Sequence, residues 1–96
     1  MQWTFTATVV EWRGPAPYLF VPMKESATAA VKELARGIEY WGQVPVLVTI
    51  RKTEFRTAMW PKDGRYLVPI KVAVQRAEGI SLGDRVRLRV RIVGRS

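Results

Sequence analysis

The sequence contains neither cysteine nor histidine among its 96 residues. The absence of cysteine excludes a disulfide framework, a thiolate nucleophile and a Cys-ligated zinc or iron–sulfur site. The absence of histidine removes the commonest general base and the commonest metal ligand. We therefore expect the chain to fold and act without a metal or redox cofactor.

Acidic residues are also scarce, with 8 Asp and Glu against 16 Lys and Arg. No two acids occupy adjacent or alternate positions, no serine lies in a G-x-S-x-G setting, and glycine-rich phosphate loops are absent. The sequence thus predicts a protein that is not an enzyme. The formal charge of +8 favours an anionic partner, such as a polyanion or an acidic protein, although small basic domains also use charge for solubility alone.

Long apolar runs are absent as well, since no stretch approaches the ~18 residues that a membrane-spanning helix needs. The first residues, from Met1 to Phe5, include no Lys or Arg, so they do not have the pattern of a signal peptide. The length corresponds to one domain over residues 1–96, and we expect it in the cytoplasm.

Alternating apolar and polar residues predict several β-strands. The clearest stretch runs from Arg85 to Ile92, where every arginine is followed by an aliphatic residue. Less regular stretches, bounded by turns that contain proline or glycine, predict the others. The six predicted strands cover residues 3–9, 18–21, 44–51, 54–60, 65–68 and 85–92.

Two segments show helical character. Between Glu25 and Gly37 the apolar residues fall on one face, which predicts an amphipathic helix that ends at Gly37. A short helical segment is expected from Val72 to Glu78. The fold class is therefore mainly β, a small closed β-barrel of about six strands with one amphipathic helix, because closure removes the edges that an open sheet exposes.

Several short motifs follow one another along the chain. They are Phe20-Val21-Pro22, Val44-Pro45-Val46, Phe55-Arg56-Thr57, Gly64-Arg65-Tyr66, Pro69-Ile70-Lys71, Arg76 and Gly83-Asp84-Arg85-Val86. In this order and spacing, from Phe5 to about Val93, the chain resembles DUF1905, a bacterial barrel family whose name marks it as a domain of unknown function. The resemblance implies a closed β-barrel with one helix, found alone or ahead of a domain linked by name to bacteriocin protection. It implies no catalytic residues.

The chain departs from this family pattern in one loop. A glycine is expected between the strand that begins at Val44 and the strand that contains Phe55, and Arg51-Lys52-Thr53 stand there instead. The departure concerns the backbone shape of the loop and not the barrel. A looser resemblance, to AbrB and antitoxin-type barrels that bind DNA, rests on Gly83-Asp84-Arg85-Val86 alone.

The strongest candidate for a binding site is the row of arginines on one face of the last predicted strand, Arg85, Arg87, Arg89 and Arg91. Alternate residues of a strand stand about 7 Å apart, so the row spans about 20 Å and could follow a phosphate backbone or an acidic partner. If the first and last strands pair, Thr4, Thr6 and Thr8 lie beside the row and add hydroxyl donors. The alternative is a solvated exterior whose charge discourages pairing of strand edges.

A second candidate is a ligand site at the mouth of the barrel, formed by aromatic side chains near strand ends together with one arginine. These residues are Trp41, Trp60, Tyr66 and Arg76. Aromatic faces can hold an apolar or planar ligand, but small barrels are also filled by such side chains. For Arg76 the structural alternative is an ion pair with Glu54 or Asp84.

The sequence leaves three functional hypotheses. The first is a non-catalytic binding or interaction module whose ligand the sequence does not identify. The second is binding of nucleic acid or another polyanion through the arginine row. The third is a small-ligand barrel with an aromatic mouth.

Overall fold

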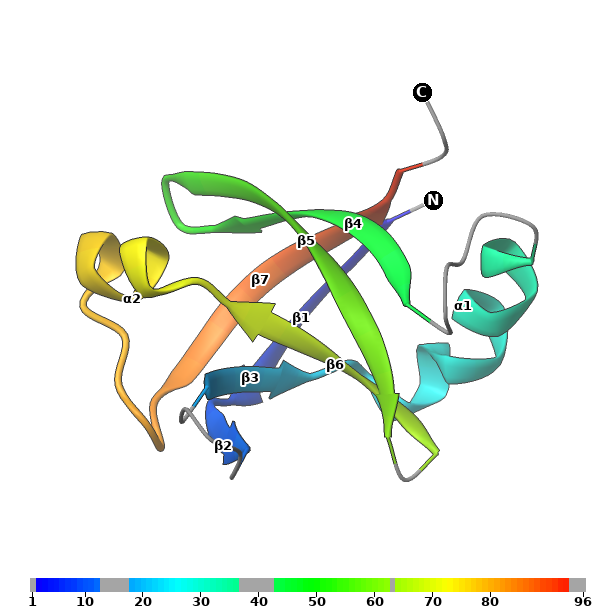
Figure 1. Ribbon diagram of the computed structural model, residues 1–96, viewed down its shortest axis with the longest axis horizontal. Helices are drawn as coiled ribbons and strands as arrows, with labels where there is room; N and C mark the ends of the chain where they lie inside the picture. The colour runs from blue at the N-terminus through cyan, green and yellow to red at the C-terminus, as the bar shows by residue number, and fades with distance from the viewer. Residues whose placement is uncertain (1, 13–17, 37–42, 63, 94–96) are drawn as a thin grey trace.

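Seven β-strands and two α-helices make up the fold over the described residues, which in this computed structural model are 2–12, 18–36, 43–62 and 64–93 (Figure 1). The strands are β1 (Gln2–Thr8), β2 (Val10–Trp12), β3 (Tyr18–Pro22), β4 (Val44–Ile50), β5 (Thr53–Lys62), β6 (Arg65–Ile70) and β7 (Arg85–Ile92). The helices are α1 (Thr28–Ala35), which follows the 3-10 turn η1 (Glu25–Ala27), and α2 (Val72–Glu78).

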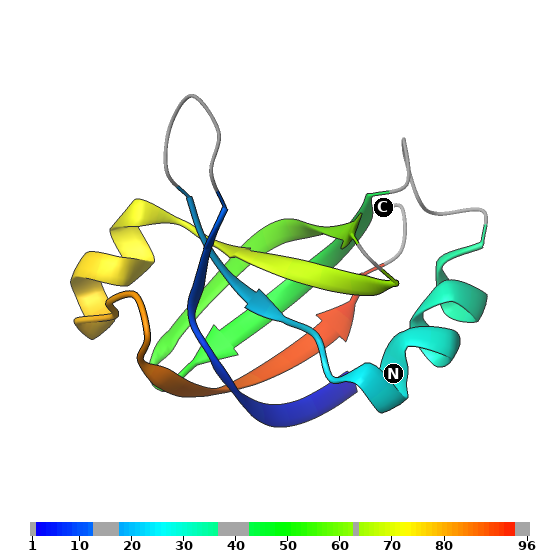
Figure 2. The ribbon, with the colours of Figure 1, turned by 90° about the horizontal axis from the view of Figure 1, so that it is seen from below.

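The strands form one antiparallel sheet in the order β1-β7-β4-β5-β6-β3-β2. Strand β5 joins two halves of this sheet, since it pairs with β4 up to Met59 and with β6 from Trp60 onward. We call β1, β7, β4 and the first part of β5 the β7 half, and the end of β5, β6, β3 and β2 the β6 half. The sheet curls so that the two halves enclose the core between them (Figures 1 and 2).

The chain passes between the halves a second time at Val9. Before this residue β1 pairs with β7, and after it β2 pairs with β3. The backbone N–H of Val9 donates to the carbonyl of Asp84 at 2.8 Å, and the N–H of Gly83 donates to the carbonyl of Val9 at 3.0 Å. These two bonds fix the bend against the turn that precedes β7.

The closed six-stranded barrel expected from the sequence is wrong in strand number and in closure. The sheet has seven strands, and over the described residues β1 and β2 are its two edges, so that it is a half-barrel. The sequence pattern does not reveal β2, because the adjacent residues Val9 and Val10 interrupt the alternation at the bend. The six strands that the pattern predicts are all present, and the mainly β class is confirmed.

The inward sides of both halves form a single apolar core. Buried residues alternate with partly exposed ones along the whole of β4. In β7, Val86, Leu88 and Val90 are buried and the arginines between them are exposed, which confirms the predicted direction of this strand. Ile92 is partly exposed and packs against the same core. No charged or polar residue is buried in the described part of the chain, so apolar packing holds the two halves together.

The two helices lie at opposite ends of the half-barrel (Figures 1 and 2). The helix predicted from Glu25 to Gly37 is present as η1 followed by α1, which ends at Ala35, and Gly37 lies outside the described residues. The helical segment predicted from Val72 to Glu78 is confirmed as α2, and Gly79 ends it in the left-handed conformation with φ of 62°. No helix among the described residues is long and apolar enough to cross a membrane.

Candidate polyanion interface

The arginines of β7 form one exposed row along the outward face of the β7 half. Strand β7 lies between β1 and β4, so that the row occupies the middle of this face and not its edge. At about 3.3 Å per residue the row spans about 20 Å. Its members, which we call the arginine row, are Arg85, Arg87, Arg89 and Arg91, and all four are exposed.

Strand β1 places polar side chains directly beside the arginine row. The antiparallel register sets Thr4 opposite Arg89 and Thr6 opposite Arg87, with Thr8 and Gln2 continuing the pattern at the two ends. This confirms that the first and last strands pair and that the threonine hydroxyls flank the row. Hydroxyl and amide groups are donors that suit phosphate oxygens.

Strand β4 borders the other side of the row, and two depressions lie over the face that β1, β7 and β4 form. A depression of about 70 Å³ lies among Gln2, Leu47, Thr49, Glu54, Arg89 and Arg91. A second of about 290 Å³ lies among Thr4, Thr49, Arg51, Arg87, Leu88 and Arg89. Arg89 and Thr49 line both, so this cross-strand pair is at the centre of the face. An acid, Glu54 of β5, lies beyond Thr49 on the same face, since it is the cross-strand partner of Thr49.

The arginine row carries concentrated positive charge. In the described part of the chain the ion pairs join Arg36 to Glu33 and Arg51 to Glu78, and neither involves the row. Two like unit charges 7 Å apart repel by about 0.6 kcal/mol in water. Each inner arginine therefore has unfavourable interactions on both sides, which a bound anion would offset.

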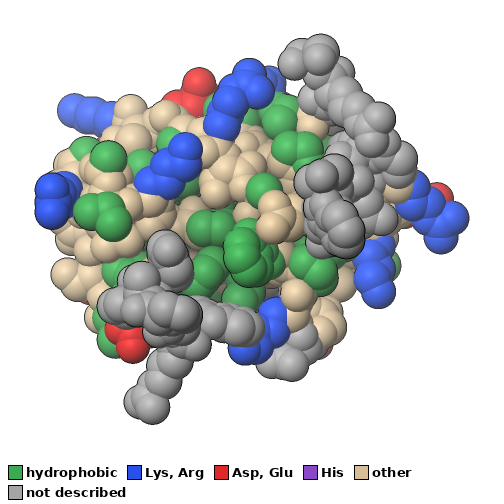
Figure 3. All heavy atoms as spheres, viewed as in Figure 1, with side chains coloured by type: hydrophobic (Ala, Val, Ile, Leu, Met, Phe, Trp, Pro, Cys, Tyr) green, Lys and Arg blue, Asp and Glu red, His purple; other side chains and the backbone are tan. Residues whose placement is uncertain are grey.

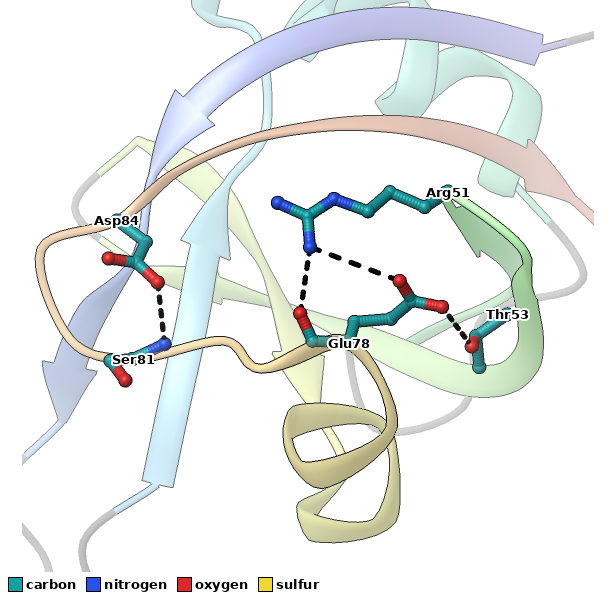
Figure 4. A network of polar contacts seen from close by, with 5 residues as sticks. All are labelled: Arg51, Thr53, Glu78, Ser81 and Asp84. Carbon is teal, nitrogen blue, oxygen red and sulfur yellow. Dashed lines mark hydrogen bonds and ion pairs between the residues drawn. The ribbon is translucent and has the colours of Figure 1, made fainter.

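Arg51 extends this basic face beyond the end of β4 and is held by α2 (Figure 4). Its Nη1 donates to the carbonyl of Glu78 at 2.7 Å and lies 3.9 Å from Oε1 of the same residue. The hydroxyl of Thr53 donates to Oε2 of Glu78 at 2.5 Å. Arg51 has a positive φ of 54° at the loop where the family pattern expects a glycine. Reasoning from the sequence did not assign Arg51 to the site, although the missing glycine was the signal that marked it.

The turn before β7 leads directly into Arg85, the first arginine of the row. The carboxylate of Asp84 accepts a hydrogen bond from the backbone N–H of Ser81 at 2.8 Å, and the N–H of Asp84 donates to the carbonyl of Ser81 at 3.1 Å (Figure 4). Gly83 supplies the positive φ of 88° that this turn requires. The Asp84 carboxylate therefore has a partner within the turn, the backbone N–H of Ser81.

Of the residues proposed for an aromatic mouth, Trp60 and Tyr66 do not come together. Trp60 is 49% exposed and pairs with Leu67, whereas its neighbour Pro61 pairs with Tyr66, which is 3% exposed. Trp60 and Tyr66 therefore face opposite sides of the hairpin, since successive residues of a strand alternate. Arg76 is exposed on α2, and in the described part of the chain it forms no ion pair with Glu54 or Asp84. Trp41 lies outside the described residues.

The described residues bring no three acidic side chains together in a group that could hold a metal ion. No curated protein matches the sequence. A family described as Domain of unknown function (DUF1905) matches residues 5–90, which include β1 from Phe5 and the arginine row up to Arg89. Since this match covers most of the 96 residues, the chain belongs to the DUF1905 family.

Proposed function

We propose that the domain is a non-catalytic binding module that holds a polyanion along the arginine row, with single-stranded nucleic acid as the first candidate. One observation carries the proposal. The four arginines are exposed, regularly spaced and without an ion pair in the described part of the chain. A chain of phosphates supplies repeated negative charge that matches such a row.

The chemistry of the face favours contacts to the nucleic-acid backbone. Each guanidinium can donate two hydrogen bonds to phosphate oxygens, and the hydroxyls of β1 can donate to phosphate or sugar oxygens. No aromatic side chain lies on the outward face of the β7 half among the described residues, so base stacking does not add to binding there. We therefore expect little sequence preference and a strong dependence on salt.

The curvature of the sheet favours a single strand over a duplex. The sheet curls around the core (Figure 2), and the burial pattern of β7 places the arginine row on the outer, convex side. Duplex DNA is stiff over about 150 base pairs, so it touches a convex surface of this size over only a short length. A flexible single strand can follow the surface and reach all four arginines.

The proposal is tested by titrating the protein with a fluorescent single-stranded oligonucleotide at several salt concentrations. Four phosphate contacts predict a log–log salt slope of about −3, a loss of roughly 50-fold in affinity between 50 and 200 mM salt. The double variant Arg87→Glu with Arg89→Glu is expected to lose binding. The control variant Lys24→Glu with Arg36→Glu makes the same change in charge at exposed residues next to η1 and α1. This control is expected to keep most of the affinity for the oligonucleotide. Equal weak binding by all three proteins would leave the row as a solubilising surface and overturn the proposal.

A further inference from the structure

A hollow separate from the arginine row lies between the β5–β6 hairpin and α1. Its volume is about 220 Å³, room for several water molecules at about 30 Å³ each. The hairpin contributes Lys62 and Arg65, and the helix contributes Thr28 and Lys32. The hairpin and α1 lie side by side at one end of the half-barrel in both ribbon views (Figures 1 and 2). None of these residues lines the depressions on the arginine row.

The hollow gathers positive charge. Lys62 and Arg65 are directly opposite one another in the hairpin, an arrangement of like charges that destabilises a pair of strands. Lys32 faces them from α1, and no acid lines the hollow among the described residues. Asp63, which stands between the two hairpin cations in the sequence, lies outside the described residues. Three cations and one acid leave an excess of positive charge.

Two of the residues that line the hollow each carry a buried polar atom that has no partner among the described residues. In the described part of the chain two buried side-chain atoms have no hydrogen-bond partner, Oγ1 of Thr28 and Nε of Arg65, and both residues line this hollow. Leaving a buried donor unsatisfied costs about 1–3 kcal/mol. The guanidinium of Arg65 is also held in place, because its Nη2 donates to the carbonyl of Met23 at 2.7 Å. A donor and a hydroxyl in the wall of the hollow are thus both without a partner in the described part of the chain.

We propose that this hollow binds a phosphate-type oxyanion, either free phosphate or the terminal phosphoryl group of a small molecule. The oxygens of a tetrahedral anion accept hydrogen bonds from the Thr28 hydroxyl and from Nε–H of Arg65. Its charge pairs with the ammonium of Lys32. The inference stands apart from polyanion binding at the arginine row, since the two surfaces share no residue.

The test is a titration of the ¹⁵N-labelled protein with inorganic phosphate at constant ionic strength, followed by NMR. The Nε–H resonance of Arg65 reports directly on the proposed contact and is expected to shift and saturate. The Nε–H resonances of the arginine row are expected to shift only weakly and without saturation. A nucleoside monophosphate and the matching nucleoside form two further arms. Tighter binding of the monophosphate than of phosphate identifies the ligand as a phosphomonoester, and tighter binding of phosphate identifies the free ion.

Two variants and one control locate the site. Thr28→Val removes the hydroxyl at nearly constant shape, and Lys32→Gln removes one exposed charge; each is expected to weaken phosphate binding about tenfold or more. Thr28→Val is expected to unfold at no lower temperature than the parent without phosphate, because it removes an unsatisfied buried group. Lys71→Gln removes the same charge at the start of α2, at the opposite end of the half-barrel, and is expected to bind as the parent does. The absence of a saturating shift at Arg65, or parental affinity in both Thr28→Val and Lys32→Gln, would overturn the inference.

Discussion

The two halves of the sheet share one core but present opposite chemistry to the outside. On the β7 half, one cross-strand row reads Thr4, Arg89, Thr49 and Glu54, and the next reads Gln2, Arg91, Leu47 and Arg56. On the β6 half, the corresponding rows read Trp60, Leu67 and Pro22, and then Pro69, Phe20 and Val10. The first face is basic and hydroxylated, and the second is apolar.

Figure 3 shows this apolar face, with hydrophobic side chains gathered at the centre and Lys and Arg side chains around them. Phe20 illustrates the difference between the two sides of the sheet. It is 6% exposed, yet it does not belong to the core cluster, since its register with Pro69 and Val10 places it on the outward side. Folding demands apolar residues on the inward side of both halves, so the outward side is where the two halves can differ in function.

The largest expected effect tests whether the halves depend on one core. Val90 in the β7 half and Val68 in the β6 half are both 0% exposed. Placing an unpaired carboxylate there, as in Val90→Asp or Val68→Asp, costs several kcal/mol, comparable with the whole stability of a small domain. Neither variant is expected to show a cooperative thermal transition by circular dichroism. The control Arg89→Asp, on the outward side, is expected to melt cooperatively, and a variant in which one half stays folded would contradict the single core.

The next largest effect separates the outward faces. The double variant Trp60→Ser with Leu67→Ser removes the centre of the apolar row and leaves the arginine row intact. It is expected to bind the oligonucleotide within about twofold of the parent, and to bind less of a hydrophobic dye. The result that would contradict this separation is a loss of affinity of 5-fold or more, because stacking of a base on an aromatic ring contributes about 1–3 kcal/mol. Such a loss would mean that the nucleic acid extends over both halves.

A smaller effect is expected at Arg51, the cation of the basic face that also serves the fold. Its side chain holds Glu78, and its φ of 54° is unfavourable for a residue with a side chain. Arg51→Ala removes the contacts and retains the backbone strain, so we expect a loss of about 1 kcal/mol. Arg51→Gly also removes the contacts but releases the strain, and is expected to be more stable than Arg51→Ala by roughly 0.5–1 kcal/mol. Urea titrations of the three proteins measure the order, and equal stability of the Gly and Ala variants would rule out strain.

The sequence predicts those parts of the fold that have a regular residue pattern or a recognisable turn. The alternation from Arg85 to Ile92 is long enough to define both the strand and its inward side, and the hairpin around Gly64 follows from turn chemistry. The half-barrel does not follow from such patterns. The shape of the sheet depends on where the chain leaves β7 to pair with β3, and the backbone bonds of Val9 to the turn before β7 mark this bend.

The candidate sites also differ in whether the sequence could predict them. The arginine row and its threonine neighbours could be predicted, because alternation and strand pairing place them. The hairpin hollow could not, since it depends on how α1 lies against β5 and β6, and nothing in the spacing of Thr28 and Arg65 indicates that both line one space. Trp60 and Tyr66 do not face a common space, because Tyr66 pairs with Pro61, and Pro61 and Trp60 are successive residues that face opposite ways.

The smallest expected effect concerns the stability of the arginine row itself. Arg87 lies between Arg85 and Arg89, each about 7 Å away, and in the described residues no acid pairs with any of the three. Arg87→Gln removes two repulsive interactions without touching the core, so the variant is expected to be more stable than the parent by a few tenths of a kcal/mol at low salt. The difference should vanish in about 1 M salt, where the screening length falls to about 3 Å. The matched outward change Leu67→Gln on the apolar face has no such charge to remove, and its effect on stability is expected to be the same at both salt concentrations. Denaturant titrations at low and high salt measure both differences. A lower stability of Arg87→Gln than of the parent at low salt would contradict the prediction, because it would show that Arg87 stabilises the fold without a bound anion.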